Sequence, residues 1–342
     1  MKEAKKRIEY IDLAKGICIL LVVWLHITDS VKFAGLGETD IVIKYSSAFL
    51  MPLYFFLSGM FFKTDGHGWN FILKKINKLL VPFLAFNLIS CILGYILISL
   101  GLGNFGRVAS YCGWQSFFYF VNGEVYLNQP IWFLLCLFEV NVIYYCVHLL
   151  TKGNVLVKML IVSVVGIAGY ILMFDLGVWL PCFMSKAMYF LPFFVMGEVV
   201  RKYSTLLIDS KGLKYDIGAF FIALFVFVLL SPVSNILFAK FNMLNFYVCG
   251  FTGTIMVLLL SKIVKKVPAV SYIGRYSIVT LCLHYYYYPI ILKFLMLYFT
   301  NSYVLNIGTF LITTLIGLVF IPLCIRYLPY IFAQKDLIKI KE

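Results

Sequence analysis

The sequence predicts an all-α integral membrane protein that crosses the bilayer about ten times, with both termini on the cytoplasmic side. Of its 342 residues, 63% are apolar and only 13% are charged. Soluble domains are about half apolar, so this excess indicates that lipid is the solvent. The spread of basic residues along the chain gives the orientation. We expect a single transmembrane domain over residues 1–342, with no separate soluble domain.

Ten apolar runs, separated by charged or turn-rich stretches, are the predicted spans. They lie at 10–29, 46–62, 79–100, 131–150, 155–174, 186–200, 217–232, 243–261, 271–292 and 303–325. Several are shorter than the roughly 20 residues that a helix needs to cross the hydrocarbon core unaided. The sixth is the weakest, because its apolar run is short and contains Pro192 and Gly197. The longest loop predicted outside, at 101–130, is rich in glycine and aromatic residues and either caps the outer mouth or lies in the interface.

Lysine and arginine alternate strongly between the two sides of this arrangement. With the N-terminus inside, 23 of the 29 fall on the cytoplasmic side. A wrong number of spans would scramble this alternation, so the bias supports both the span number and the orientation. Basic cytoplasmic loops also explain the net charge of +14, and we expect no nucleic-acid partner.

The first span carries three ionisable residues on one helix face. Lys15 and His26 are separated by three helical turns plus about 20°, and Asp12 shares their face. Helical rise places His26 roughly 16 Å deeper than Lys15. Such a stripe must face a polar cavity rather than lipid. The alternative is a structural histidine, with Lys15 extending to the headgroups.

Further ionisable residues lie in or beside other spans. Lys75 and Lys78 flank the third span at its predicted cytoplasmic end, either as ordinary flanking charges or as a clamp for phosphate groups. Glu139, near the middle of the fourth span, is either protonated and packed or paired with a base such as His26. That pairing would fix the imidazole tautomer and make it more basic, as general-base catalysis requires. His284 is a second buried imidazole, for which a structural role is the simpler interpretation.

These residues resemble the motifs of the membrane acyltransferase-3 family, the multi-pass O-acyltransferases of bacterial surface polysaccharides. Tyr10-Ile-Asp-Leu-Ala-Lys15-Gly-Ile…His26 is similar to the basic residue, ten residues and histidine of the family. Phe55-Phe-Leu-Ser58-Gly59 resembles its Phe-Phe-x-Ser-Gly run, and Lys75-x-x-Lys78 corresponds to its Arg-x-x-Arg. Trp132-Phe-Leu with Glu139, and Gly274…Ser277…His284, also fit. The resemblance covers nearly the whole chain in order.

The resemblance is closest to the short fucose O-acetylases and enterobacterial-common-antigen O-acetyltransferases. It implies transfer of an acyl group, usually acetyl from cytoplasmic acetyl-CoA, to a hydroxyl of a cell-surface or lipid-linked glycan at the bacterial inner membrane. Acyl-CoA would be a co-substrate, and no permanently bound cofactor or metal is expected. The sequence departs from the family at three arginines, which are Lys15, Lys75 and Lys78 here. Lysine lacks the bidentate fork that suits phosphate, so another donor such as succinyl-CoA stays open.

The resulting hypothesis gives His26 as general base, oriented by Glu139. Lys15, Lys75 and Lys78 would bind acyl-CoA, since they gather where its phosphates would arrive. Asp12, Ser58, Trp132 and His284 would support the site. Two rival functions are a transporter or flippase of glycan or lipid-linked intermediates, which buried polar residues also suit, and a membrane subunit that only organises an export assembly.

Overall fold

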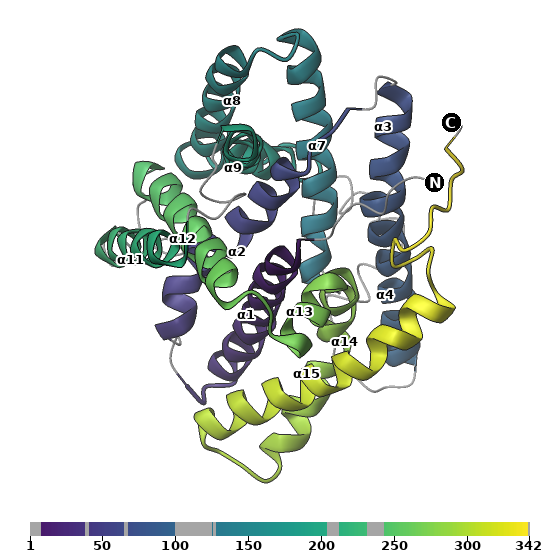
Figure 1. Cartoon of the computed structure of the whole chain (residues 1–342). Coiled ribbons are helices and arrows are strands. Elements are labelled where there is room, and N and C mark those ends of the chain that lie inside the picture. The colour runs from purple at the N-terminus through teal and green to yellow at the C-terminus, as the bar shows by residue number, and fades with distance from the viewer. Residues whose placement is uncertain are drawn as a thin grey trace, which may run out of the picture. The chain divides into compact units, whose positions relative to one another are not determined.

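The computed structural model describes residues 8–37, 41–64, 68–99, 125, 128–203, 212–230 and 243–340. This part of the chain is helical and contains no β-strand (Figure 1). The all-α prediction is therefore confirmed. The predicted loop at 101–130 falls almost entirely outside the described residues, as does the end of the seventh predicted span at 231–232.

Nine helical segments among the described residues are long and apolar enough to cross a membrane. They are Glu9–Phe33, Ile41–Met60, Gly68–Ile96, Gln129–Leu150, Val155–Asp175, Leu213–Leu230, Met243–Val264, Ser277–Met296 and Ser302–Tyr327. Each contains or overlaps one predicted span. The chain is thus a polytopic integral membrane protein.

The sixth predicted span corresponds to helix α9 (Met184–Tyr203), which is not one of these nine. Its length is sufficient, but Lys186, Glu198 and Arg201 lower its hydropathy. A helix with this many charges is stable in a membrane only if other protein elements or the interface cover them.

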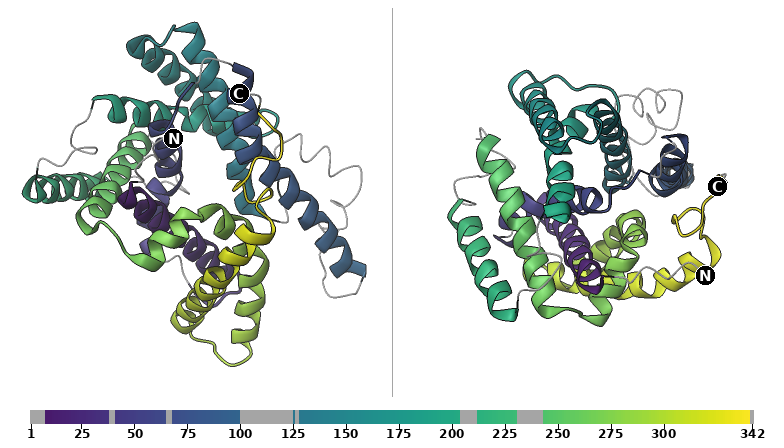
Figure 2. Two further views of the ribbon diagram at one scale, coloured as in Figure 1. Left: turned by 45° about the vertical axis from the view of Figure 1, so that its right-hand side comes forward. Right: turned by 45° about the horizontal axis from the view of Figure 1, so that its top comes forward.

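Helix α11 (Leu213–Leu230) has a lipid-facing apolar surface. Phe221, Ile222 and Phe225 are each about three-fifths or more exposed, a pattern expected of hydrocarbon-facing residues. Its one acidic residue, Asp216, is buried and pairs with Lys262 of α12 (Met243–Val264), with Oδ1 and Nζ 3.2 Å apart. The two helices lie side by side in every view (Figures 1 and 2), so that no lone charge of this pair faces the lipid.

The described residues form two compact units, each built from two stretches of chain. Unit 1 comprises Met1–Met60 and Met196–Ile321. At its centre α1 (Glu9–Phe33) lies against α13 (Pro268–Arg275), α12, α14 (Ser277–Met296) and α2 (Ile41–Met60) (Figure 1).

Two glycines allow α1 and α13 to pack in direct contact in unit 1. A Cβ on Gly274 of α13 would collide with the Asp12 carbonyl oxygen of α1, and one on Gly16 would collide with the Val270 carbonyl. The two helices therefore touch backbone to backbone, a packing that only small residues permit in membranes.

The ninth predicted span, 271–292, is not one helix. Tyr276, with φ of −115° and ψ of 33°, separates α13 from α14. Apolar residues continue through the break, so periodicity gives no sign of it. The prediction of a single helix was wrong here because the contact of Gly274 with α1, rather than hydropathy, sets the direction of α13.

Unit 2 comprises Phe61–Val195 and Pro322–Glu342. Its helix α7 (Trp132–Leu150) contacts α3 (Gly68–Lys75), the π-helix η1 (Ile76–Leu80), α4 (Val81–Ser99) and α8 (Val155–Tyr170). Phe62 joins them, since its ring lies edge-on to Tyr144 at 4.8 Å and contacts Phe71 and Phe194. Aromatic pairs of this kind add to the stability that burial supplies.

A C-terminal segment, 328–340, which we call the strap, follows α15 (Ser302–Tyr327) and runs beside η1 (Figure 2). The Asn77 side chain forms two hydrogen bonds of 2.8 Å with the backbone of Ile338, donating to its carbonyl and accepting from its N–H. Phe332 is 1% exposed and packs on Phe86 at 5.2 Å. These contacts fix the strap on the helices of unit 2.

Candidate functional site

The structure brings two of the predicted site residues together within unit 1. The rings of His26 (α1) and His284 (α14) lie 5.5 Å apart between centroids, tilted by 34°. Tyr285 meets His26 edge-on at 5.4 Å. His284 has no exposed surface, whereas His26 keeps part of its surface accessible. The pair thus joins one reachable imidazole to one that is fully enclosed.

The hydrogen bonding of His284 identifies its tautomer. Its Nδ1 lies 2.7 Å from the carbonyl oxygen of Thr280. A carbonyl only accepts, so Nδ1 carries the proton and Nε2 carries the lone pair. No described residue forms a hydrogen bond with Nε2, although it is buried. This nitrogen is a buried acceptor beside His26.

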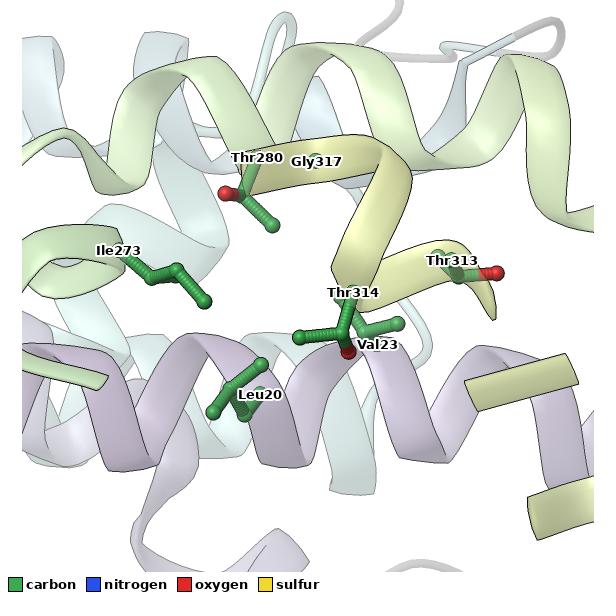
Figure 3. A pocket seen from close by; sticks show the side chains of 7 residues that line it. All are labelled: Leu20, Val23, Ile273, Thr280, Thr313, Thr314 and Gly317. Atoms are coloured by element: carbon green, nitrogen blue, oxygen red, sulfur yellow. The ribbon is translucent and has the colours of Figure 1, made fainter. Parts of the chain in front are cut away.

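A small pocket lies one helical turn from His284. It is lined by Leu20, Val23, Ile273, Thr280, Thr313, Thr314 and Gly317, which come from four helices of unit 1 (Figure 3). Its volume of about 10 Å³ is enough for about one water molecule. The three threonine hydroxyls are buried and have no hydrogen-bond partner within the described residues. The interior near His284 therefore holds unsatisfied hydroxyl groups within a mainly apolar lining.

The other predicted residues of unit 1 lie on α1 and α2. Helix α1 runs from Glu9 to Phe33 with no proline inside, so Asp12, Lys15 and His26 keep regular helical spacing. The backbone carbonyl of Lys15 accepts a hydrogen bond of 3.1 Å from the Tyr54 hydroxyl of α2. Ser58 is half-buried one turn further along α2.

Lys75 and Lys78 occupy different environments in unit 2. Lys75 closes α3, and its Nζ lies over the Phe71 ring at 5.3 Å. Lys78 lies within η1, where its Nζ donates to the Ala333 carbonyl at 2.7 Å and pairs with Asp336 at 3.2 Å. No local sequence pattern predicts Asp336 as a partner of Lys78, because the strap follows η1 by about 250 residues. The π-helix also changes the angle between the two lysines that regular α-helical spacing predicts.

Glu139 lies on α7 in unit 2 and is 8% exposed. Its Oε1 accepts a hydrogen bond of 3.2 Å from the backbone N–H of Phe183. Its Oε2 is also buried, and no described residue forms a hydrogen bond with it. The pairing of Glu139 with His26 stays a prediction.

The turn that brings Phe183 to Glu139 is conformationally unusual. Cys182 has φ of 57°, a region that residues other than glycine seldom adopt. Backbone of this kind tends to persist at functional sites, where the surroundings hold it in place. Burial raises the pKa of the Cys182 thiol, and the neighbouring charge of Glu139 raises it further.

Trp132, predicted to support the site, opens α7 and contacts a residue that the sequence did not single out. The Nζ of Lys186 lies 4.6 Å from the centre of its ring. Trp179 and Phe183 contact the same ammonium. The only sequence signal was an isolated lysine at the start of a weak span. Across the described part of the chain, no three His, Cys, Asp or Glu side chains group as a metal site.

The chain also matches a model of a known protein family. Residues 8–326 match the family described as an acyltransferase domain. The matched region contains all the predicted site residues. No curated protein and no solved structure shows significant similarity to the chain.

Proposed function

This chain belongs to the acyltransferase-3 family, and we propose that it transfers an acetyl group from acetyl-CoA to a hydroxyl of a cell-surface or lipid-linked glycan. The membership supports a membrane acyltransferase, with an acyl donor, an acceptor and a lipid environment. The donor, the acceptor and the cytoplasmic entry of the donor are our proposal. The observation that carries it is the imidazole pair of His26 and His284 inside a membrane-spanning unit.

The proposed reaction forms one ester bond and breaks one thioester bond. The acceptor hydroxyl attacks the thioester carbonyl while His26 takes its proton as general base. The C–S bond breaks, and His26 returns the proton to the departing CoA thiolate. Charge and atoms balance, so no further reactant is needed.

His284 is positioned to act through His26. Its Nε2 is a buried acceptor, and the centre of the His26 ring lies 5.5 Å from the centre of its own ring. An N–H of His26, directly or through one water, would satisfy this acceptor and leave the other nitrogen of His26 basic. Glu139 is the predicted alternative for the same orienting role, since its Oε2 is available to a donor.

Replacing His284 tests this positioning role. We expect His284→Phe to lower kcat about ten- to a hundredfold, because the acceptor for His26 is lost, while KM for acetyl-CoA stays unchanged. His284→Gln keeps an acceptor oxygen and should recover part of the rate. The measurement is free-thiol release in nanodiscs as a function of pH. If kcat falls equally in both variants and its pH dependence is unchanged, His284 has only a structural packing role.

The donor would bind where Lys15, Lys75 and Lys78 supply positive charge, because acetyl-CoA is polyanionic. One of these lysines, Lys78, already forms a hydrogen bond and an ion pair with the strap. The Lys78–Asp336 pair is 46% and 41% exposed at its two side chains, and exposed pairs of this kind contribute only about 0–1 kcal/mol. Phosphate groups would therefore displace Asp336 at little cost.

If donor phosphate and Asp336 compete for Lys78, substitutions on the two sides of this pair should change donor affinity in opposite directions. We expect Lys75→Ala/Lys78→Ala to weaken acetyl-CoA binding by about tenfold or more, and Asp336→Asn to strengthen it by up to about fivefold. Binding is measured on protein in nanodiscs, with Lys44→Ala on α2 as the control. If wild type binds no acetyl-CoA and also no succinyl-CoA, the acyl-CoA donor is refuted. If Asp336→Asn weakens binding, the strap assists the donor and does not compete with it.

A further inference from the structure

A cluster in unit 2 surrounds one lysine with aromatic rings. The Nζ of Lys186, in the first turn of α9, lies 4.6 Å from the ring centre of Trp132, 5.3 Å from Phe183 and 5.6 Å from Trp179. These rings come from the start of α7 and from the segment before α9. An ammonium over aromatic faces is held by the ring quadrupoles, so the three rings fix its position without an obligatory anion.

A buried carboxylate adjoins these rings. Glu139 accepts a hydrogen bond from the backbone of Phe183, the residue that supplies one ring. Spacings of four and three residues put Trp132, Cys136 and Glu139 on one face of α7. Phe183 links the two charged residues, since its N–H donates to Glu139 and its ring lies 5.3 Å from the Nζ of Lys186. We call Trp132, Glu139, Trp179, Phe183 and Lys186 the Lys186 cluster.

A purely structural explanation accounts for part of the cluster. Tryptophan is common at the membrane interface, which suffices for Trp179 with its 61% exposure. It does not explain Glu139, which is more than nine-tenths buried and whose Oε2 has no partner among the described residues. A buried polar atom without a partner is rare, because leaving it unsatisfied costs free energy. Such an oxygen is expected where a ligand donates a hydrogen bond.

We propose that the Lys186 cluster binds a saccharide ring of the acyl acceptor. The cluster offers a carboxylate oxygen that accepts, an ammonium that donates, and indole faces that remove apolar surface from water. A hydroxylated sugar ring combines the matching groups: O–H donors, ether and hydroxyl acceptors, and C–H faces. The exposed ring of Trp179 leaves the cluster open on one side. The inference rests on the proposed function, to which it adds the place and class of the acceptor.

Ligand-observed NMR without donor tests the site directly. The probes are the methyl glycosides of glucose, galactose, fucose and N-acetylglucosamine, added at millimolar concentration to protein in nanodiscs. We expect at least one to bind wild type and to lose about tenfold in affinity in Trp179→Ala and in Lys186→Met. Trp69→Ala is the matched control, since Trp69 lies on α3 in the same unit and is 69% exposed. It should bind as wild type does.

The same proteins are then assayed for thiol release from acetyl-CoA with and without the bound glycoside. Trp179→Ala should raise the acceptor KM about tenfold, whereas Trp69→Ala should leave both the acceptor KM and donor hydrolysis unchanged. If no glycoside binds wild type, or if the variants and Trp69→Ala bind equally, the acceptor site is refuted even when acetyl-CoA is consumed. If the glycoside binds as expected but no acyl-CoA is consumed, the saccharide site stands and the proposed transferase function fails.

Discussion

Replacing His26 by alanine is expected to lower acyl transfer by about 10²- to 10⁴-fold while leaving acetyl-CoA binding unchanged. His26 is the accessible member of the imidazole pair, and His284 beside it is enclosed. Removing the accessible ring removes the group that takes the proton of the acceptor hydroxyl. The lysines proposed to bind the donor are untouched, so the loss should appear in kcat and not in donor affinity.

Free-thiol release and donor binding, recorded on the same nanodisc samples, separate these two effects. His148→Ala is a suitable control, because His148 near the end of α7 packs on Phe62 and takes no part in the proposed chemistry. Full transfer by His26→Gln would refute the general-base role. Loss of donor binding in His26→Ala, with the fold intact, would show instead that the histidine helps to hold the donor.

The positions of most membrane helices could be predicted from the sequence, because hydropathy is a local property of the chain. Within the part of the chain that the structure describes, each of the nine helices long and apolar enough to span contains or overlaps a predicted run. The prediction was weakest where charge and hydropathy conflict, as in α9, and where a helix breaks without a polar signal, as at Tyr276. It also missed that the third span starts at Gly68, because α3 and η1 extend it through a lysine-rich stretch.

The candidate site was predictable only where one helix carries several of its residues. Asp12, Lys15 and His26 follow from helical periodicity on α1. The contact between His26 and His284 depends on how α1 and α14 pack, which no local pattern encodes. The same holds for Lys186, whose aromatic partners come from separate segments, and for Asp336, which reaches Lys78 through the strap. Trp132 and Lys186, like Lys78 and Asp336, are far apart in sequence, whereas Trp179 and Phe183 are close neighbours of Lys186 along the chain.

Replacing Gly274 by alanine is expected to destabilise unit 1 by about 3 kcal/mol or more. The added Cβ would collide with the Asp12 carbonyl oxygen and with the backbone of Gly16. Both obstacles are backbone atoms of α1, so no side-chain rotation relieves them. The measurement is the apparent melting temperature in detergent, which should fall by several degrees.

Gly218→Ala provides the matched control for this change. Gly218 is also helical, on α11, but a Cβ there would meet nothing within 4 Å. Alanine should be neutral or should stabilise the helix by about 0.5–1 kcal/mol. Equal melting temperatures for the two variants would mean that α1 and α13 are not in backbone contact.

Gly274→Ala should also affect the imidazole pair. Helix α1 carries His26, and α13 leads directly into α14, which carries His284. If the glycine contact sets the distance between the two rings, Gly274→Ala should lower transfer in the fraction of protein that remains folded. Gly197→Ala separates this effect from general instability. Its Cβ would collide with the Phe56 carbonyl of α2 and not with α1. Comparable destabilisation with normal turnover per folded molecule in that variant would identify the α1–α13 contact as the element that aligns the two histidines.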